Sequence, residues 1–277
     1  MHAKDFKLGI IGVGNMAEAI LKCVLSSELL GNTDVTAYEI REPRKKFIKR
    51  NYGINFQSCL SDLVVKSRFI LIEVKPQDII KVLEDAKPFI NSGPVTIISI
   101  AAGVSTALIE NKLGNGIPVL RIMPNTPALL NRGMSAISRG RFTGSKDIDF
   151  AVKLIKSTGN YIIVDEKIQN TVTAISGSGP AYFFLFCKSL VDAAVKKGVD
   201  RKTARILVSS TAAGAGEMLV KFGCDTDYLI KMVASPGGTT EEALKQFENM
   251  NISKVIYTAV DIAEKKAIEI QKKLETT

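Results

Sequence analysis

The sequence predicts an α/β domain with a mostly parallel sheet, followed by an all-α half. The first part alternates short β-rich apolar runs with helical stretches, a pattern typical of strands joined by crossover helices. Beyond about Lys167 the strand-like runs stop and helical patterns replace them. A chain of 277 residues with 46% hydrophobic content suits two modest domains. We therefore expect a sheet domain at residues 1–166 and a helical domain at residues 167–277.

The expected strands are, in chain order, KLGII, DVTAY, RFILIEV, PVTIISI, PVLRIM, GMSAIS and NYIIVDE. Each run is short and apolar, and most are rich in β-branched residues. Helices between the strands would cover the sheet. The later strands follow one another closely, so their direction in the sheet is left open.

The helical half begins with a stretch that Pro180 can open and Gly198 can stop. Asp200 can cap the next helix, which runs to Gly223. Two more helices are expected after it, the last from about Asn251 to the end. The stretch RILVSSTAAGAGEMLV is small or apolar on nearly every face, so it should be buried on most sides. A helical half of this size can hardly bury it alone, and we expect subunits to share helices.

Composition excludes several classes of function. The net charge of +9 comes from scattered lysines and arginines without interleaved aromatic residues, which argues against nucleic-acid binding. The only histidine is His2, so histidine bases, serine triads and histidine metal sites are excluded. The cysteines form no C-x-x-C pair that would suggest zinc or disulfides; they are Cys23, Cys59, Cys187 and Cys224. No run is long enough to span a membrane, and no signal peptide is recognised, so we expect a cytoplasmic protein.

A glycine loop follows the first expected strand. Gly12, Gly14 and Ala17 fit G-x-G-x-x-G/A at a strand-to-helix turn, which is the phosphate loop of a Rossmann-type dinucleotide-binding domain. The first glycine makes the turn, the second lets the backbone approach a diphosphate, and the alanine allows close helix packing. The helix N-terminus offers amides and a partial positive charge to the anion. A glycine-rich turn without a ligand is the alternative interpretation.

The second strand ends at the position where such domains bind the adenosine ribose. Glu39 can accept hydrogen bonds from the ribose hydroxyls and would repel a 2′-phosphate, which favours NAD. Arg41 and Arg44 can instead bind that phosphate, which favours NADP. The two signals conflict, and the residues also fit a solvated strand end.

Two further loops follow strands and should lie at the same sheet edge, where open α/β sheets bind their ligands. Small residues there let a ring or sugar lie close to the backbone, and Lys75 can bind a phosphate or carboxylate. The residues of these loops are Val74, Lys75 and Pro76, and Ala101, Ala102 and Gly103.

Two stretches interrupt the helical half. SGSGP, residues 176–180, reads as a helix break before a proline-started helix, either a hinge or a wall of a site. In SPGGTT, residues 235–240, the glycines let the backbone turn, and Thr239 with Glu242 fits a capping box that starts a new helix. A loop and helix start also expose amides that can bind a carboxylate.

Six stretches together resemble one family: GVGNMAEAI, VKPQ, SIAAGVS, RIMPNTPALL, TAISGSGPAYFF and ASPGGTT. The chain is similar, almost end to end, to the pyrroline-5-carboxylate reductases. The resemblance implies reduction of the cyclic imine 1-pyrroline-5-carboxylate to L-proline by NADPH, with NADH as an alternative. It also implies a Rossmann domain, a helical domain through which two copies form a homodimer, and further assembly of dimers into rings.

The resemblance also assigns roles to residues. It places the substrate beside residues 235–240, with Thr240 at the imine nitrogen as the catalytic residue, and makes Ser178 part of the wall. The substrate residues it implies are Ser178, Ser235, Gly237, Gly238, Thr239 and Thr240. The cofactor residues it implies are Ile11, Gly12, Val13, Gly14, Asn15, Met16, Val74, Lys75, Pro76, Ala101, Ala102, Gly103, Asn125 and Thr126, to which the ribose analysis adds Glu39 and Arg41. No metal is required.

The chain departs from the family pattern at several positions. Glu73 stands where an alanine is usual, Leu60 where an asparagine often contacts the adenosine, and Asn170 where an aspartate is usual. The segment GCDTDY lacks the common glutamate-histidine-proline. Two alternatives stay open: a β-hydroxyacid dehydrogenase-like enzyme, with Lys188, Lys196 or Lys197 as acid/base, and a dinucleotide-sensing protein without turnover.

Overall fold

The computed structural model describes residues 4–91, 93–114, 116–223 and 225–276, so His2 and Cys224 lie outside the described residues. Its contacts divide the chain into two compact units. The first comprises Met1–Ser178 together with Ile262–Thr277, and the second comprises Gly179–Asp261. The first unit is a mixed α/β sheet domain and the second is all helical, which confirms the expected fold class.

The sheet of the first unit has the strand order β3-β2-β1-β4-β5-β6-β7-β8. The strands β1 to β6 are parallel, while β7 pairs antiparallel with β6 and parallel with β8, so the later strands do run the other way. All seven expected strands are present. The strands are β1 (Phe6–Ile11), β2 (Val35–Tyr38), β3 (Asn55–Phe56), β4 (Ser67–Ile72), β5 (Thr96–Ser99), β6 (Val119–Met123), β7 (Gly133–Arg139) and β8 (Gly159–Ile163). The sequence prediction missed β3, an edge strand of two residues.

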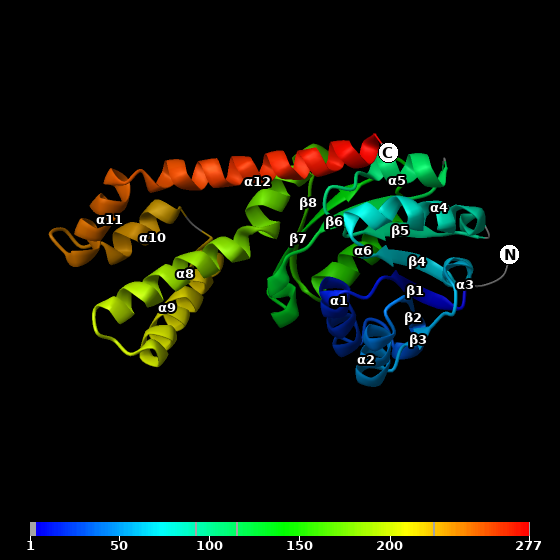
Figure 1. Ribbon diagram of the computed structural model, residues 1–277, viewed down its shortest axis with the longest axis horizontal. Coiled ribbons are helices and arrows are strands. Elements are labelled where there is room, and N and C mark those ends of the chain that lie inside the picture. Colours follow the sequence, from blue (N-terminus) through cyan, green and yellow to red (C-terminus); the bar gives the residue numbers. More distant parts are fainter. Residues whose placement is uncertain (1–3, 92, 115, 224, 277) are drawn as a thin grey trace. The chain divides into compact units, whose positions relative to one another are not determined.

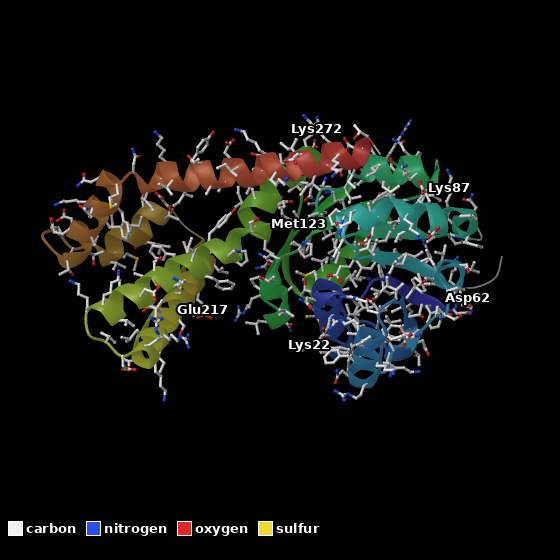
Figure 2. The ribbon with its side chains drawn as sticks, in the orientation of Figure 1. Lys22, Asp62, Lys87, Met123, Glu217 and Lys272 are labelled. Carbon is white, nitrogen blue, oxygen red and sulfur yellow. The ribbon has the colours of Figure 1, made fainter. Side chains whose placement is uncertain are left out.

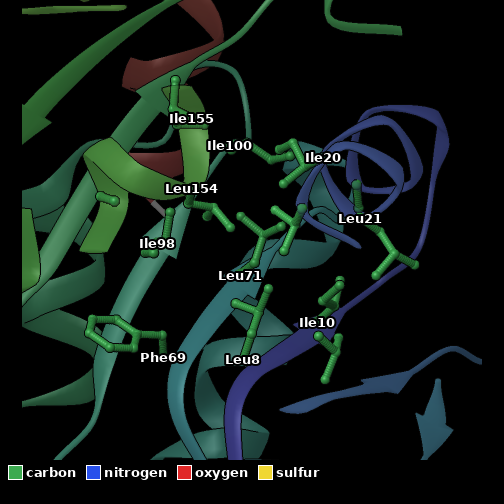
Figure 3. Packing of buried hydrophobic residues seen from close by; sticks show 14 of the residues in the cluster. Leu8, Ile10, Ile20, Leu21, Phe69, Leu71, Ile98, Ile100, Leu154 and Ile155 are labelled. Carbon is green, nitrogen blue, oxygen red and sulfur yellow. The ribbon is translucent and has the colours of Figure 1, made fainter. Parts of the chain in front are cut away.

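Helices cover both faces of this sheet, and each face has its own apolar core (Figure 1). One core lies between the sheet and α1 (Asn15–Ser26), α2 (Glu42–Tyr52) and α6 (Ser145–Lys156); Figure 3 shows Leu71 and Ile98 of the strands beside Ile20 of α1 and Leu154 of α6. The other core lies beneath α3 (Leu60–Lys66), α4 (Ile79–Ile90) and α5 (Thr106–Leu113). Burial on both faces explains why these strands read as continuous apolar runs.

The last helix, α12 (Ile252–Glu275), returns to the first unit. Leu274 joins the core beneath α4 and α5, and the side-chain amide of Asn170 donates a 2.9 Å hydrogen bond to Gln271 Oε1. Asn170 also accepts a 3.2 Å bond from the buried Arg121, so this departure from the family pattern anchors α12. The contacts group residues 262–277 with the sheet domain. The expected division into two domains at residue 166 stays a prediction.

The second unit contains α8 (Gly179–Lys196), α9 (Arg201–Phe222), α10 (Thr226–Val233), α11 (Thr239–Asn249) and the beginning of α12. Asp200 caps α9 by accepting 3.0 Å bonds from the amides of Lys202 and Thr203, as expected. In the described residues, three helices instead of two follow α9, because the loop before α11 and Asn251, with φ 59°, each interrupt the helical pattern. Most of α9 is exposed in the single chain, with Ala204 its one buried described residue.

Candidate functional site

Four loops follow the parallel strands β1, β4, β5 and β6 and therefore share the carboxyl edge of the sheet. Three backbone hydrogen bonds join the ends of β1, β2, β4 and β5 directly. The amide of Gly12 donates to the carbonyl of Tyr38 at 2.9 Å, that of Glu73 to Ile11 at 2.9 Å, and that of Ile100 to Ile72 at 3.2 Å. The structure thus brings together the loops that the sequence analysis assigned to the cofactor. This edge is where open parallel sheets bind their ligands.

The glycine loop has the backbone that a diphosphate needs. Gly12 has φ 78°, and a Cβ there would fall on the carbonyl oxygen of Glu73, so the position requires glycine. Gly14 is the N-cap of α1 with extended backbone, which leaves the first amides of the helix directed out of the loop. The loop therefore fits a dinucleotide diphosphate. One feature was missed by the sequence analysis: Glu73 Oε1 accepts the amide of Met16 at 2.9 Å.

Glu39 is buried at the end of β2 and accepts hydrogen bonds from both sides. The amide of Val13 donates to Oε2 at 3.0 Å, and Arg41 donates its backbone amide and two guanidinium nitrogens at 2.9 to 3.0 Å. Burial by itself would raise the pKa of the Glu39 carboxyl, but the bonds from Arg41 and Val13 together hold it below its usual value. Glu39 is therefore an ionised acceptor joined to the glycine loop.

Arg44, the other candidate for a 2′-phosphate, is committed to the glycine loop. It donates to the carbonyls of Val13 at 2.6 Å and Gly14 at 2.9 Å, and it forms an ion pair with Glu18 of α1 at 2.5 Å. Arg44 thus connects the glycine loop to α2 through these hydrogen bonds. Arg41 is the arginine with the more exposed side chain, which leaves it better placed to reach a ligand from solvent.

The loops after β4 and β5 differ in how far they are exposed to solvent. Lys75 is exposed and precedes a short 3-10 turn, Pro76–Asp78. Gly103 has φ 74° and packs on α12, where a Cβ would lie 2.8 Å from Cγ2 of Ile270. The small size of Gly103 is therefore required for contact with α12, a constraint that the sequence does not reveal.

Asn125, after β6, joins this edge to the helical segment that precedes α8. Its Nδ2 donates to both the carbonyl and Oγ of Ser176 at 3.3 Å, and its Oδ1 accepts the amide of Met134 at 2.8 Å. Thr126, next to it, is exposed. The contact between Asn125 and Ser176 could not be identified from the sequence, because it joins residues 51 positions apart.

The SGSGP stretch contains the expected break at Ser178, a bend directly before α8, and the turn that precedes it is π-helical. Residues Thr173–Gly177 form a π-helical turn between α7 (Gln169–Val172) and α8, and the amide of Ser178 donates to the carbonyl of Thr173 at 2.9 Å. Gly177 packs on Met123 at the end of β6, a residue labelled in Figure 2. Such π-helical turns are frequent at functional sites.

The expected capping box at SPGGTT is wrong by one residue. The N-cap of α11 is Gly238, with extended backbone, and Thr239 is the first helical residue. Glu241 accepts the amide of Gly237 at 2.7 Å, while Glu242 pairs with Lys245 at 2.8 Å. The two glycines carry the turn, with Gly237 at φ 70°, so the helix begins without a threonine cap.

Two further observations limit the chemistry. In the part of the chain that the structure describes, no group of three or more histidine, cysteine, aspartate or glutamate side chains could hold a metal ion. Within the same residues, no helix is long and apolar enough to cross a membrane. Lys188, a candidate acid/base of the hydroxyacid dehydrogenase alternative, is exposed and pairs with Asp192 at 2.8 Å.

A parallel sheet with this glycine loop is typical of a dinucleotide-binding domain, and an all-helical unit accompanies it. The family described as NADP oxidoreductase, coenzyme F420-dependent, matches residues 7–103, and pyrroline-5-carboxylate reductase dimerisation matches residues 166–270. The pyrroline-5-carboxylate reductase of Methanosarcina acetivorans is 33% identical over 96% of this chain and 98% of its own. Reductase 2 of Bacillus subtilis is 30% identical over 96% and 95%. This chain belongs to the pyrroline-5-carboxylate reductase family.

Solved structures agree with this assignment. A pyrroline-5-carboxylate reductase from Coxiella burnetii has a TM-score of 0.89 at 29% identity, covering 96% of this chain and 99% of that one. The Plasmodium falciparum enzyme with NADP bound has a TM-score of 0.86 at 29% identity, covering 98% and 100%. Membership of this family excludes the hydroxyacid dehydrogenase and sensor alternatives. The chain is an oxidoreductase of proline biosynthesis with a dinucleotide-binding domain and a dimerisation domain.

Proposed function

We propose that this chain reduces the C=N bond of 1-pyrroline-5-carboxylate to give L-proline, with NADPH as the donor and NADH as the alternative donor. The observation that carries the proposal is the full-length similarity to pyrroline-5-carboxylate reductases. When bound, the cofactor supplies the hydride to the imine carbon, and the nitrogen takes a proton. This chemistry needs no histidine or metal from the protein.

The cofactor site is proposed at the carboxyl edge of the first unit. Residues 11–16 would hold the diphosphate, and Glu39 and Arg41 would contact the adenosine ribose. The nicotinamide would lie beside residues 74–76, residues 101–103, Asn125 and Thr126. What supports this proposal is the shared edge of the four loops and the positive φ of Gly12, which leaves room for an anion.

The substrate is proposed to bind at residues 235–240, with Ser178 as part of the wall. The start of α11 offers amides and the positive end of a helix dipole to the substrate carboxylate. Glu241 already binds the amide of Gly237, so the carboxylate would use the amides after it. The hydroxyl of Thr240 has no hydrogen-bond partner among the described residues, and it would donate to the imine nitrogen as hydride arrives at the carbon.

A homodimer through the C-terminal helices is the proposed assembly, with rings of dimers as a further step. The helical unit leaves many large apolar side chains exposed in one chain, more than a soluble monomer usually carries. They include Phe183, Phe184, Leu185, Ile206, Leu207, Val220, Val255 and Ile256. A division into functional domains at residue 166 and a cytoplasmic location complete the proposal; cell fractionation tests the location.

The deciding experiment mixes the purified chain with NADPH or NADH and 1-pyrroline-5-carboxylate. We expect substrate-dependent oxidation of the cofactor and accumulation of L-proline in equal amounts. A β-hydroxyacid in place of the imine is the control and should give no reaction. Binding of the cofactor without any oxidation in the presence of the imine would contradict the proposed activity.

A further inference from the structure

The carboxylate of Glu73 lies inside the glycine loop. Glu73 follows β4 directly, and its Oε1 accepts the amide of Met16 at 2.9 Å. A Cβ added to Gly14 would lie 2.7 Å from Oε2 and 2.9 Å from Oε1 of Glu73. The carboxylate therefore fills the space beside the second glycine of the motif and binds the first turn of α1.

The same space and the same amides are what a dinucleotide diphosphate uses. The second glycine of this motif lets the diphosphate approach the backbone, and the N-terminus of the following helix binds its negative charge. A carboxylate and a diphosphate cannot both occupy this position, because two anions would share one set of amides and repel each other. Glu73 must therefore change its contacts or its charge when the cofactor binds.

The surroundings of Glu73 compensate its charge only in part. Its Oε2 is buried without a hydrogen-bond partner among the described residues. Burial raises the pKa of the Glu73 carboxyl, although the amides of Ala17, Met16 and Gly14 and the charge of Arg44 act in the opposite direction.

The nearby cations are largely engaged elsewhere. Arg44 of α2 binds the loop carbonyls and Glu18 of α1, Arg41 binds Glu39 at the end of β2, and Lys75 of the same loop as Glu73 is exposed. The cations whose charge acts on Glu73 are Arg44 and Arg41, and each is paired with another carboxylate, Glu18 or Glu39. None of these cations forms an ion pair with Glu73 in the described part of the chain.

We propose that Glu73 is an internal competitor for the cofactor diphosphate, an anion that occupies the N-terminus of α1 until the dinucleotide displaces it. This inference rests on the cofactor site of the proposed function. It makes three statements about affinity. The carboxylate weakens binding of NADH and NADPH by a similar factor, because the diphosphate is common to both. Binding strengthens as the pH falls, because protonation removes the competing charge, and binding is accompanied by proton uptake.

The test measures the dissociation constant of NADH by titration calorimetry, without substrate, for the wild type, Glu73→Gln and Glu73→Ala. NADH is the probe for the pH series because the 2′-phosphate of NADPH titrates near pH 6, as other phosphate monoesters do. Asp85→Ala is the matched control, since Asp85 is an exposed carboxylate on α4 of the same unit. Thermal melts of the ligand-free proteins check that each variant folds.

We expect Glu73→Gln to bind NADH about tenfold more tightly than the wild type at about pH 8, equivalent to about 1.4 kcal/mol. Wild-type affinity should rise as the pH is lowered, whereas the affinity of Glu73→Gln should stay nearly constant. Asp85→Ala should follow the wild type. At constant pH, Glu73→Gln should also bind NADPH and inorganic pyrophosphate more tightly than the wild type, by the same factor as NADH. Glu73→Ala should show a gain in affinity at least as large.

Other outcomes would overturn the proposal. Unchanged or weaker NADH binding by folded Glu73→Gln and Glu73→Ala would mean that Glu73 only stabilises α1. A gain for NADPH without a gain for NADH or pyrophosphate would place its effect at the ribose phosphate instead. The proposed function is tested separately by imine reduction: a protein with the expected binding but no reduction would contradict that function and leave the role of Glu73 intact.

Discussion

Glu39 and Arg41 form a bidentate pair at the end of β2, with Nε and Nη2 of the arginine 3.0 and 2.9 Å from the two carboxylate oxygens. The carboxylate is buried, while 60% of the arginine side chain is exposed. The exposed guanidinium of Arg41 is therefore paired with Glu39, and a 2′-phosphate would compete with this pair for it. If Glu39 and Arg41 contact the ribose as proposed, the preference between NADH and NADPH depends on whether this pair opens.

Replacing Glu39 tests that dependence. Glu39→Ser removes the partner of Arg41 and a charge that repels a phosphate, so the ratio of NADPH to NADH affinity should rise about tenfold. The gain should disappear in the double variant Glu39→Ser with Arg41→Ala, because the phosphate would lose its cation. Dissociation constants for both cofactors measure the effect. A ratio that does not move would show that this end of β2 does not contact the ribose.

The two glycines of the phosphate loop should respond differently to valine. Gly14→Val would place its side chain against the flexible Glu73 carboxylate and in the diphosphate space, so cofactor binding should weaken while the fold survives. Gly12→Val meets the backbone carbonyl of Glu73 at φ 78°, so it should lower the melting temperature as well. Calorimetric binding and thermal melts separate the two outcomes. Unchanged cofactor affinity in Gly14→Val would contradict the assignment of this loop.

The fold was readable from the sequence because its strands are buried on both faces. Runs such as Ile70, Leu71 and Ile72 supply residues to opposite cores and therefore appear continuously apolar. The glycine loop was equally visible, because its residues are neighbours in the chain. What local pattern cannot show is a long-range partner: Glu73 reaches Met16 across 57 positions, and only the folded sheet brings them together.

The last helix shows the same limit. An amphipathic pattern predicts that α12 buries one face, but it does not name the surface on which that face lies. The structure packs Ile270 against Gly103 and Leu274 into a core of the first unit. The start of α11 is a smaller case: TTEE fits a capping box with Thr239 as N-cap, but the helix begins one residue earlier, with the extended Gly238 as N-cap and no side-chain cap.

Disruption of the apolar surface of α9 should dissociate the dimer. Leu207 is 56% exposed in the single chain, and Leu207→Glu would place a charge in the proposed interface twice, once from each subunit. Because about 1.5 kcal/mol or more is lost for each of the two buried leucines, the dissociation constant of the dimer should rise at least a hundredfold. Light scattering should find monomer or aggregate with little activity, while Lys46→Glu on α2 should remain a dimer. An active dimer of Leu207→Glu would contradict the proposed interface.

A truncation after Asn251 is a weaker test of the same idea. We expect it to give insoluble or inactive protein, but the deletion also removes residues 262–277 from the first unit. Loss of solubility could then arise from the opened core around Leu274 alone. The point substitution on α9 avoids this second effect.

Substitution of the two glycines that flank Ser178 should show whether each position borders the substrate or only packs against the sheet domain. A Cβ on Gly179 meets nothing within 4 Å, so Gly179→Val should leave the melting temperature nearly unchanged and lower kcat/KM if this segment borders the substrate. A Cβ on Gly177 would collide with Cε of Met123, so Gly177→Val should also cost stability. Equal losses of stability and turnover in Gly179→Val would favour a purely structural role for the segment.

The start of α11 gives the sharpest test of the catalytic assignment. Thr240→Ala removes the hydroxyl proposed to bind the imine nitrogen, so kcat/KM should fall about ten- to a few-hundred-fold, the equivalent of about 1.5 to 3 kcal/mol. Cofactor affinity and melting temperature should not change. Thr239→Ala should now alter stability by no more than about 0.5 kcal/mol, because Thr239 is not the cap.

Glu241→Ala is the matching stability variant. It removes the 2.7 Å bond to the amide of Gly237 and a negative charge from the first turn of α11, and it should cost about 1 kcal/mol. Steady-state kinetics and thermal melts on the three variants decide the matter together. If Thr240→Ala keeps the wild-type kcat/KM while Glu241→Ala lowers the melting temperature, residues 235–240 form only a helix start, and the group that binds the imine nitrogen lies elsewhere.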